Sequence, residues 1–210
     1  FGHGLHHMLT RQTVAAVSGI NGVAWDAVEL PSQFLENWCW ERESLALISG
    51  HHETGEPLPD ELLEKLLAAR TFQSAMMLAR QLEFSLFDFR LHRDWGTAGI
   101  SSVQALLDEV RDQVAVVMPP DFNRFQNGFS HIFAGGYAAG YYSYKWAEVL
   151  SADAFSRFEE EGIFNRATGD DFRCNILEAG GSRDPMELFV AFRGRAPDIG
   201  PLLRHSGISN

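Results

Sequence analysis

The chain has 210 residues, of which 45% are apolar and 21% charged, as is typical of a soluble globular protein. Its 17 basic and 28 acidic residues give a net charge of −11, which repels a phosphate backbone and argues against a nucleic-acid partner. No apolar run is long enough to cross a membrane, so we expect no membrane partner.

The two cysteines, Cys39 and Cys174, lie far apart and form no C-x-x-C pattern. This spacing indicates no disulfide framework, and a reducing cytoplasm is the expected location. Neither cysteine has a catalytic context in the sequence. Both are therefore predicted to be buried packing residues.

The chain opens inside a helical pattern. Leu5, Met8 and Leu9 follow helical spacing, and no helix breaker precedes the Ser-Gly pair at 18–19. We therefore expect a helix that runs from before Phe1 to about residue 17. Because it starts without a capping residue, its beginning is expected to have been cut off.

The first three residues, Phe-Gly-His, match the end of a His-Glu-x-x-His zinc motif. In that motif two histidines one turn apart hold the metal, and the glutamate serves as general base. Only the second histidine, His3, is present. A lone histidine in an amphipathic helix is more often a surface or core residue, and the adjacent His6 and His7 fit simple local composition.

The next elements are helices separated by turn residues. A helix is predicted to open at Pro31 and to end near Gly50, with a turn at 55–59. Another starts at Asp60. A third follows Thr71 and reaches about residue 93. Since this last segment is apolar nearly all round, it is expected to lie buried in the middle of a bundle.

The second half of the chain continues the helical pattern. Ser101 and Ser102 are predicted to cap a helix that reaches about residue 117 and is stopped by the Pro-Pro pair at 119–120. Further helices are expected at 141–161, 170–179, 185–193 and 198–205, after an irregular or short-helical stretch at 122–133 and a glycine-rich one at 135–140. No strand pattern occurs, so we predict an all-α chain forming one domain, 1–210.

Several motifs, in order along nearly the whole chain, resemble the zinc-peptidase core of the thimet oligopeptidase family. They are FGHGLHHML at 1–9, VELPSQFLENW at 28–38, HHETGEPLP at 51–59, AGGYAAGYYSYKW at 134–146, GGS at 180–182 and FRGR at 192–195. The resemblance implies the mostly helical, multi-helix catalytic domain of a zincin-like metalloendopeptidase that cuts short peptides inside a deep channel of a two-lobed molecule.

In this family the zinc is held by the two histidines of the motif and by a glutamate on the next helical segment. Carried over, His3 is the second histidine and Glu29 the third protein ligand, and a His₂Glu site leaves one zinc position open. The rival carboxylate Glu36 is expected to act in a cap or a salt bridge instead. His6 and Asp26 are candidates for supporting the ligands, Asp26 as the acceptor of a ligating histidine's second N–H.

The glycine- and tyrosine-rich stretch is the second part of the implied site. In the family, a histidine before the glycine pair and tyrosines after it stabilise the negative charge that develops on the scissile carbonyl oxygen. The matching residues are His131, Tyr137 and Tyr144, with Tyr141, Gly135 and Gly136 as peptide contacts and Tyr142 as a packing residue. The alternative from the residues alone is a helix start that buries aromatic rings.

The resemblance thus implies the C-terminal catalytic part of a zinc metalloendopeptidase, lacking the N-terminal lobe, that hydrolyses short peptides by metal-activated water. The first zinc histidine and the glutamate base are expected upstream of Phe1. For that reason the 210 residues alone should bind zinc weakly and hydrolyse nothing. The expected partners are short peptides and the remainder of its own polypeptide.

Two other functions remain open at this point. One is a non-catalytic helical module, derived from such a peptidase, that binds peptides in the same aromatic cleft. The other is a metal-storage or sensor domain built on His3, His6 and His7, which would have no use for the glycine- and tyrosine-rich stretch.

Overall fold

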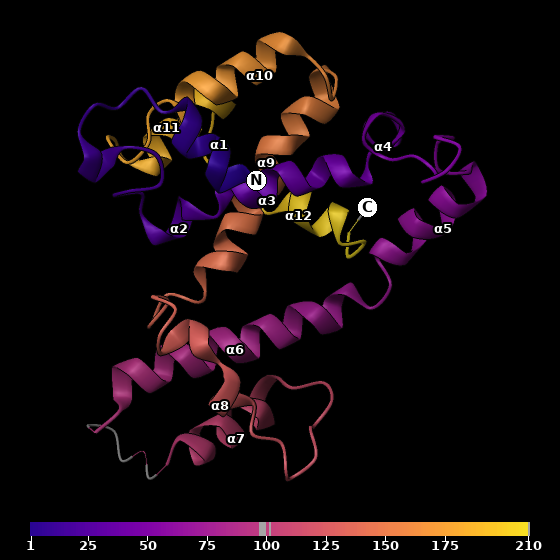
Figure 1. The fold of residues 1–210 in the computed structure, drawn as a ribbon. Helices are drawn as coiled ribbons and strands as arrows, with labels where there is room; N and C mark the ends of the chain where they lie inside the picture. The colour runs from indigo at the N-terminus through magenta and orange to yellow at the C-terminus, as the bar shows by residue number, and fades with distance from the viewer. Residues whose placement is uncertain (97–99, 101, 210) are drawn as a thin grey trace. The chain divides into compact units, whose positions relative to one another are not determined.

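The computed structural model describes residues 1–96, 100 and 102–209. The chain forms two compact units, Phe1–Phe72 with Trp146–Asn210 and Gln73–Lys145. In the described ranges all regular secondary structure is helical (Figure 1), so the predicted all-α class is confirmed. That both units belong to one catalytic domain stays a prediction.

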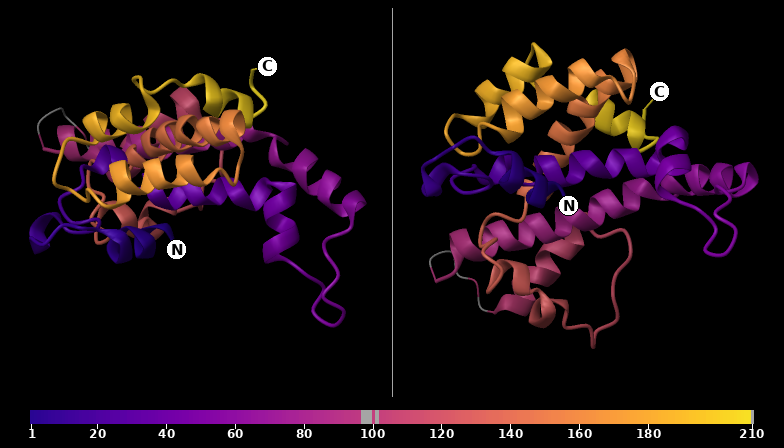
Figure 2. Two further views of the ribbon diagram at one scale, coloured as in Figure 1. Left: turned by 90° about the horizontal axis from the view of Figure 1, so that it is seen from above. Right: turned by 45° about the horizontal axis from the view of Figure 1, so that its top comes forward.

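The first unit contains most of the helices. They are α1 (Gly2–Leu9), η1 (Ala15–Val17), α2 (Trp25–Val28), α3 (Leu30–Glu36), η2 (Asn37–Trp40), α4 (Arg42–Ile48), α5 (Asp60–Arg70), most of α9 (Ser143–Glu161), α10 (Arg166–Phe172), the π-helical turn η4 (Arg173–Leu177), α11 (Pro185–Arg193) and α12 (Gly200–His205). Helix α1 packs against α3 and η4, so the N-terminal segment lies beside the later helices of the chain in both views of Figure 2.

The second unit is built on two helices that pack against each other, α6 (Ser74–Asp94) and α7 (Val103–Val114). Two short elements, α8 (Phe125–Gly128) and η3 (Ser130–Ile132), follow where an irregular or short-helical stretch was predicted. Helix α7 begins at its N-cap Ser102, whose hydroxyl accepts from the backbone N–H of Ala105. The other predicted cap, Ser101, lies outside the described residues.

The first helix is shorter than predicted, since α1 ends at Leu9 and the chain then runs extended. The backbone N–H of Arg11 and the side-chain amide of Gln12 both donate to the carbonyl oxygen of Glu178, at 3.0 and 3.2 Å. Residues 11 and 12 thus make hydrogen bonds to a distant segment in place of helical ones. These tertiary contacts override the local helical pattern.

The helix predicted from Pro31 to Gly50 is also divided. Pro31 does lie in the first turn of α3, but the backbone becomes extended at Glu41, between η2 and α4. Just before the break, the indole of Trp38 donates to the carbonyl of Ile163 at 3.0 Å. A partly buried tertiary hydrogen bond therefore ends the first segment.

Two predictions of burial were wrong. Helix α6 buries only one stripe, Glu83, Phe87, Asp88 and Leu91, because α7 covers that side; Met77, Leu82 and Phe89 are exposed. Cys39 and Cys174 are both exposed thiols rather than packing residues. None of the described helices is long and apolar enough to span a membrane.

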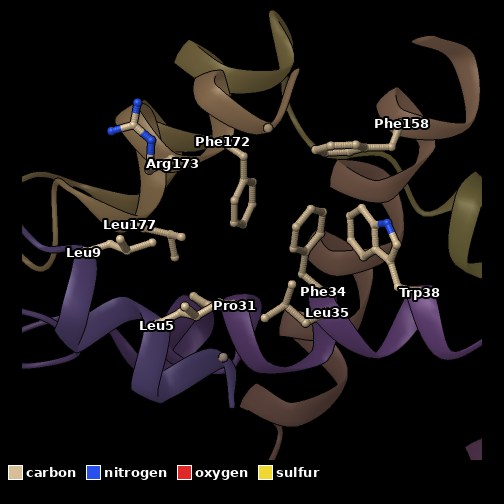
Figure 3. Close-up of a pocket in the computed structure, with 12 residues that line it drawn as sticks. Leu5, Leu9, Pro31, Phe34, Leu35, Trp38, Phe158, Phe172, Arg173 and Leu177 are labelled. Carbon is tan, nitrogen blue, oxygen red and sulfur yellow. The ribbon is translucent and has the colours of Figure 1, made fainter. Parts of the chain in front are cut away.

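An apolar pocket of about 280 Å³ lies between α1 and α3 on one side and α10 and η4 on the other, in the first unit (Figure 3). Leu5 and Leu9 come to it from α1, and Phe34 from α3. The ring of Phe34 stacks on that of Phe172, with centroids 4.0 Å apart, and Trp38 meets Phe34 edge-on at 4.9 Å. These aromatic contacts fix α3 against α10.

A buried ionic network in this unit is centred on Asp153 of α9, which is fully buried. Its carboxylate accepts from the guanidinium groups of Arg193 and Arg195, and also from the backbone N–H of Asp198 at 2.7 Å. These partners compensate the desolvation of the charge. Removing the carboxylate would leave Arg195 without its carboxylate partner and Arg193 with Glu160 as its remaining one.

We predict that Asp153→Ala lowers the free energy of unfolding by about 3 kcal/mol or more. Chemical denaturation followed by circular dichroism measures it. The matched control is Asp171→Ala, which removes the half-exposed partner of Arg157 and should cost less than about 1 kcal/mol. Equal effects of the two substitutions would contradict a special role for Asp153.

Candidate functional site

Two of the residues singled out from the sequence meet in the first unit. The Nε2 atom of His3 lies 3.1 Å from Oε2 of Glu29, although 26 positions separate them in the chain. The side chain of Glu29 is 8% exposed and that of His3 40% exposed. The imidazole is therefore accessible beside a nearly buried carboxylate.

Glu29 owes its place to the junction of two short helices, because it ends α2 and begins α3. The hydroxyl of Ser32, one turn later, lies 2.9 Å from both the backbone oxygen and Oε2 of Glu29. This hydroxyl can donate to the carboxylate and hold its orientation. Sequence reasoning missed Ser32, although its spacing from Glu29 was a usable signal.

The approach of α1 to α3 depends on Gly2. A Cβ atom at this position would lie 2.4 Å from the carbonyl oxygen of Pro31 and 2.5 Å from Cα of Ser32. Both are backbone atoms, which cannot shift without displacing α3. Only glycine allows the two backbones to come this close. Gly2 therefore places the neighbouring His3 next to Glu29.

The other histidines of α1 do not join this pair. His6 is 2% exposed, and neither of its ring nitrogens has a hydrogen-bond partner. Burial lowers the pKa of His6 to about 4, with smaller contributions from His7 and His3, so its ring is neutral near pH 7. His7 is exposed, and its ring lies against Gly19.

The nearby carboxylate Glu36 does not take the role predicted for it, and Asp26 is not a partner of His3. His3 Nδ1 is buried without a hydrogen-bond partner, so Asp26 does not support His3 in that way. For Glu36, the part of the chain that the structure describes offers neither a side-chain cap nor a basic partner. Partial desolvation and the charges of Glu148 and Glu29 instead raise the pKa of Glu36.

The geometry of His3 and Glu29 fits a metal ion of the zinc type. Imidazole nitrogen and carboxylate oxygen are suitable zinc ligands, and ligands at about 2.0–2.1 Å in a tetrahedral site are about 3.3 Å apart. The 3.1 Å separation is close to that value. Among the described residues no group of three or more His, Cys, Asp or Glu side chains could hold a metal, so this pair can supply only part of a site.

Four further predicted residues meet in the second unit. The rings of Tyr137 and Tyr144 stack with centroids 4.9 Å apart, and Tyr141 lies 5.2 Å from Tyr144. His131 lies 5.8 to 6.3 Å from all three tyrosine rings. We call His131, Tyr137, Tyr141 and Tyr144 the aromatic cluster. Tyr142 is outside it and meets Phe89 edge-on, in line with its predicted packing role.

The glycine pair shapes the loop that leads into the cluster. A Cβ atom at Gly135 would lie 2.8 Å from Cα of His131, and Gly136 has φ +87°. The backbone N–H of Tyr137 donates to the carbonyl of His131 at 3.0 Å, which ties the two residues together. Here glycine is needed for close backbone approach and for the left-handed conformation.

The hydroxyl of Tyr141, a half-buried member of the aromatic cluster, donates to Oε1 of Gln81 at 3.1 Å. Burial raises the pKa of Tyr141, and Tyr144 raises it further. The phenol therefore stays protonated and can act as a donor. Gln81 had no signal in the sequence that would single it out.

This all-α chain pairs an accessible histidine with a nearly buried glutamate and carries an aromatic loop, and its sequence places it in a class of peptidases. The profile of Peptidase family M3 matches residues 1–208, and the chain belongs to this family. The resemblance to the thimet oligopeptidase family is thereby confirmed.

Curated relatives agree with this membership. The chain is 65% identical over 208 residues to oligopeptidase A of Salmonella typhimurium, 53% over 212 residues to the organellar oligopeptidase A of Arabidopsis thaliana, and 31% over 210 residues to saccharolysin of Saccharomyces cerevisiae. These alignments cover 99 to 100% of this chain but only 27 to 31% of each relative. The chain thus spans less than a third of the length of the curated relatives it matches.

We predict opposite effects for two alanine substitutions in α1. Gly2→Ala should lower the free energy of unfolding by about 1–3 kcal/mol, because the added methyl group forces α1 away from α3. Gly4→Ala, whose Cβ would meet nothing within 4 Å, should raise it by up to about 1 kcal/mol through helix propensity. Thermal and chemical unfolding of both variants test this, and stabilisation by Gly2→Ala would contradict the steric argument.

Proposed function

We propose that the full-length protein is a zinc-dependent metalloendopeptidase, an oligopeptidase that hydrolyses short peptides in the cytoplasm. The observation that carries this proposal is the pairing of His3 with Glu29 in a chain of Peptidase family M3. Relatives named oligopeptidase A support short peptides as the substrate class.

In this proposal His3 and Glu29 supply two of the protein ligands of the zinc, and Ser32 orients the glutamate. When bound, the zinc supplies a Lewis acid for the peptide carbonyl. The remaining ligand, the general base and an N-terminal lobe come from the rest of the polypeptide. Residues 1–210 by themselves are therefore expected to hold zinc weakly and to be inactive.

The aromatic cluster has the complementary role. His131, Tyr137 and Tyr144 donate hydrogen bonds to the carbonyl oxygen of the peptide as negative charge develops there. Tyr141 and the backbone at Gly135 and Gly136 contact the peptide chain. Three of the cluster's members present a phenol, a donor that needs no proton transfer to serve this purpose.

We predict that Glu29→Ala in the full-length protein abolishes zinc retention, because it removes an anionic ligand. Ser32→Ala should keep the ligand but weaken zinc binding about 10- to 100-fold by releasing its orientation. Glu36→Ala, which removes a nearby carboxylate assigned no ligand role, is the control and should retain zinc. Metal analysis and chelator competition provide the measurement; full zinc occupancy in Glu29→Ala would refute the ligand assignment.

We predict that Tyr144→Phe and Tyr137→Phe each lower kcat on short peptides about 100-fold, with little change in KM. The expected loss falls on kcat because the hydrogen bond strengthens in the transition state. Tyr142→Phe, a change of the same kind at a packing residue, should stay within about threefold of wild type. Peptide binding without cleavage by the wild-type protein would instead favour a binding module.

A further inference from the structure

Helix α6 carries a fully buried carboxylate, Asp88, on the stripe that faces the interior of the second unit. Both of its oxygens are used. Oδ1 accepts from the backbone N–H of Ala139 and Oδ2 from that of Tyr141, each at 2.9 Å. The Nδ1 atom of His92, one turn later on α6, lies 2.9 Å from Oδ1.

One of these N–H groups belongs to the turn Tyr137–Gly140, which joins the glycine pair to α9, and the other belongs to the residue that follows this turn. Gly140 N–H donates to the carbonyl of Tyr137 at 2.8 Å, which closes the turn, and Ala139 within it has φ +53°. A left-handed alanine is unfavourable unless the surroundings hold it. The bond from Ala139 to Asp88 supplies such a hold.

The turn is directly connected to two members of the aromatic cluster. Tyr137 is its first residue, and Tyr141 follows it directly and contacts both His131 and Tyr144. If the turn left Asp88, a buried carboxylate would lose its two backbone donors, which is costly in a dry environment. The carboxylate therefore fixes the backbone from which the tyrosines project.

We propose that Asp88 is a positioning residue for the aromatic cluster, which it holds in place through the backbone N–H groups of Ala139 and Tyr141. This inference rests on the proposed function insofar as it assigns a catalytic consequence. Donors that are held in place before the substrate arrives lose no free energy to reorganisation during the reaction, so their anchor controls kcat more than KM.

The test is Asp88→Asn in the full-length protein, since asparagine keeps the shape but offers one acceptor oxygen in place of two. The matched control is Asp94→Asn on the same helix, where the carboxylate bonds the guanidinium of Arg93. Asp88→Asn should lower kcat on a short peptide by about 100-fold, with KM changed less than about threefold and zinc content unchanged. Asp94→Asn should leave all three at wild-type values.

Amide hydrogen exchange tests the anchor without reference to activity. In the wild type the amides of Ala139 and Tyr141 should exchange much more slowly than that of the exposed Gly136, and Asp88→Asn should accelerate them. Fast exchange of both amides in the wild type would overturn the proposal even if the variant failed to fold. Unchanged kcat in a variant with accelerated exchange would overturn its catalytic part.

The two readouts also separate this inference from the proposed function. A wild-type protein that retains no zinc and cleaves no peptide would refute the peptidase proposal and the catalytic consequence of the anchor. The exchange rates would still decide whether Asp88 holds the turn. If the wild type is active and Asp88→Asn changes neither kcat nor the exchange rates, the positioning role alone is refuted.

Discussion

The close contact of α1 with α3 is the constraint on which the first half of the site depends. It exists because position 2 has no side chain, so that the helix backbone reaches the carbonyl of Pro31. His3 follows Gly2 directly, and Glu29 precedes Pro31 by two positions. The distance between the imidazole and the carboxylate is therefore set by backbone packing rather than by flexible side chains, and Ser32 adds the final orientation.

Glycine serves the same purpose at other motifs of the chain. A Cβ atom at Gly180 would lie 2.4 Å from the carbonyl oxygen of Val17, and one at Gly181 would lie 2.3 Å from that of Asn21. The backbone N–H of Gly181 also donates to Val17 at 2.9 Å. These contacts hold the loop between η1 and α2 in place. Because Glu29 ends α2, they also help to position Glu29. The motif GGS at 180–182 is thus explained by packing against a segment far away in the sequence.

Local signals predicted those parts of the fold that are encoded locally. The start of α5 at Asp60 and both ends of α11 were predicted correctly, because acidic first turns, proline at N1 and glycine after the last turn act within a few residues. The end of α1 and the break at Glu41 were not. They depend on hydrogen bonds to Glu178 and Ile163, which no local pattern reveals.

The same distinction applies to the candidate site. Neither spacing nor composition would have paired His3 with Glu29, and the resemblance to a peptidase family was needed to suggest it. Asp88 and Gln81 escaped notice because their partners lie more than fifty positions away, in the turn before α9. An acidic residue between the phenylalanines of an apolar helical segment was the available signal for Asp88. Its meaning required knowing which backbone lay opposite.

The two fully buried aspartates show how the kind of partner determines what a buried carboxylate does. Asp153 is balanced mainly by the guanidinium groups of Arg193 and Arg195, so its loss should appear chiefly as lost stability. Asp88 is balanced by two backbone N–H groups and one imidazole. Because backbone donors cannot move without moving the chain, a substitution at Asp88 must alter the path of the turn. A carboxylate held in this way is suited to fixing the position of other groups, and the groups attached to this turn are the tyrosines of the aromatic cluster.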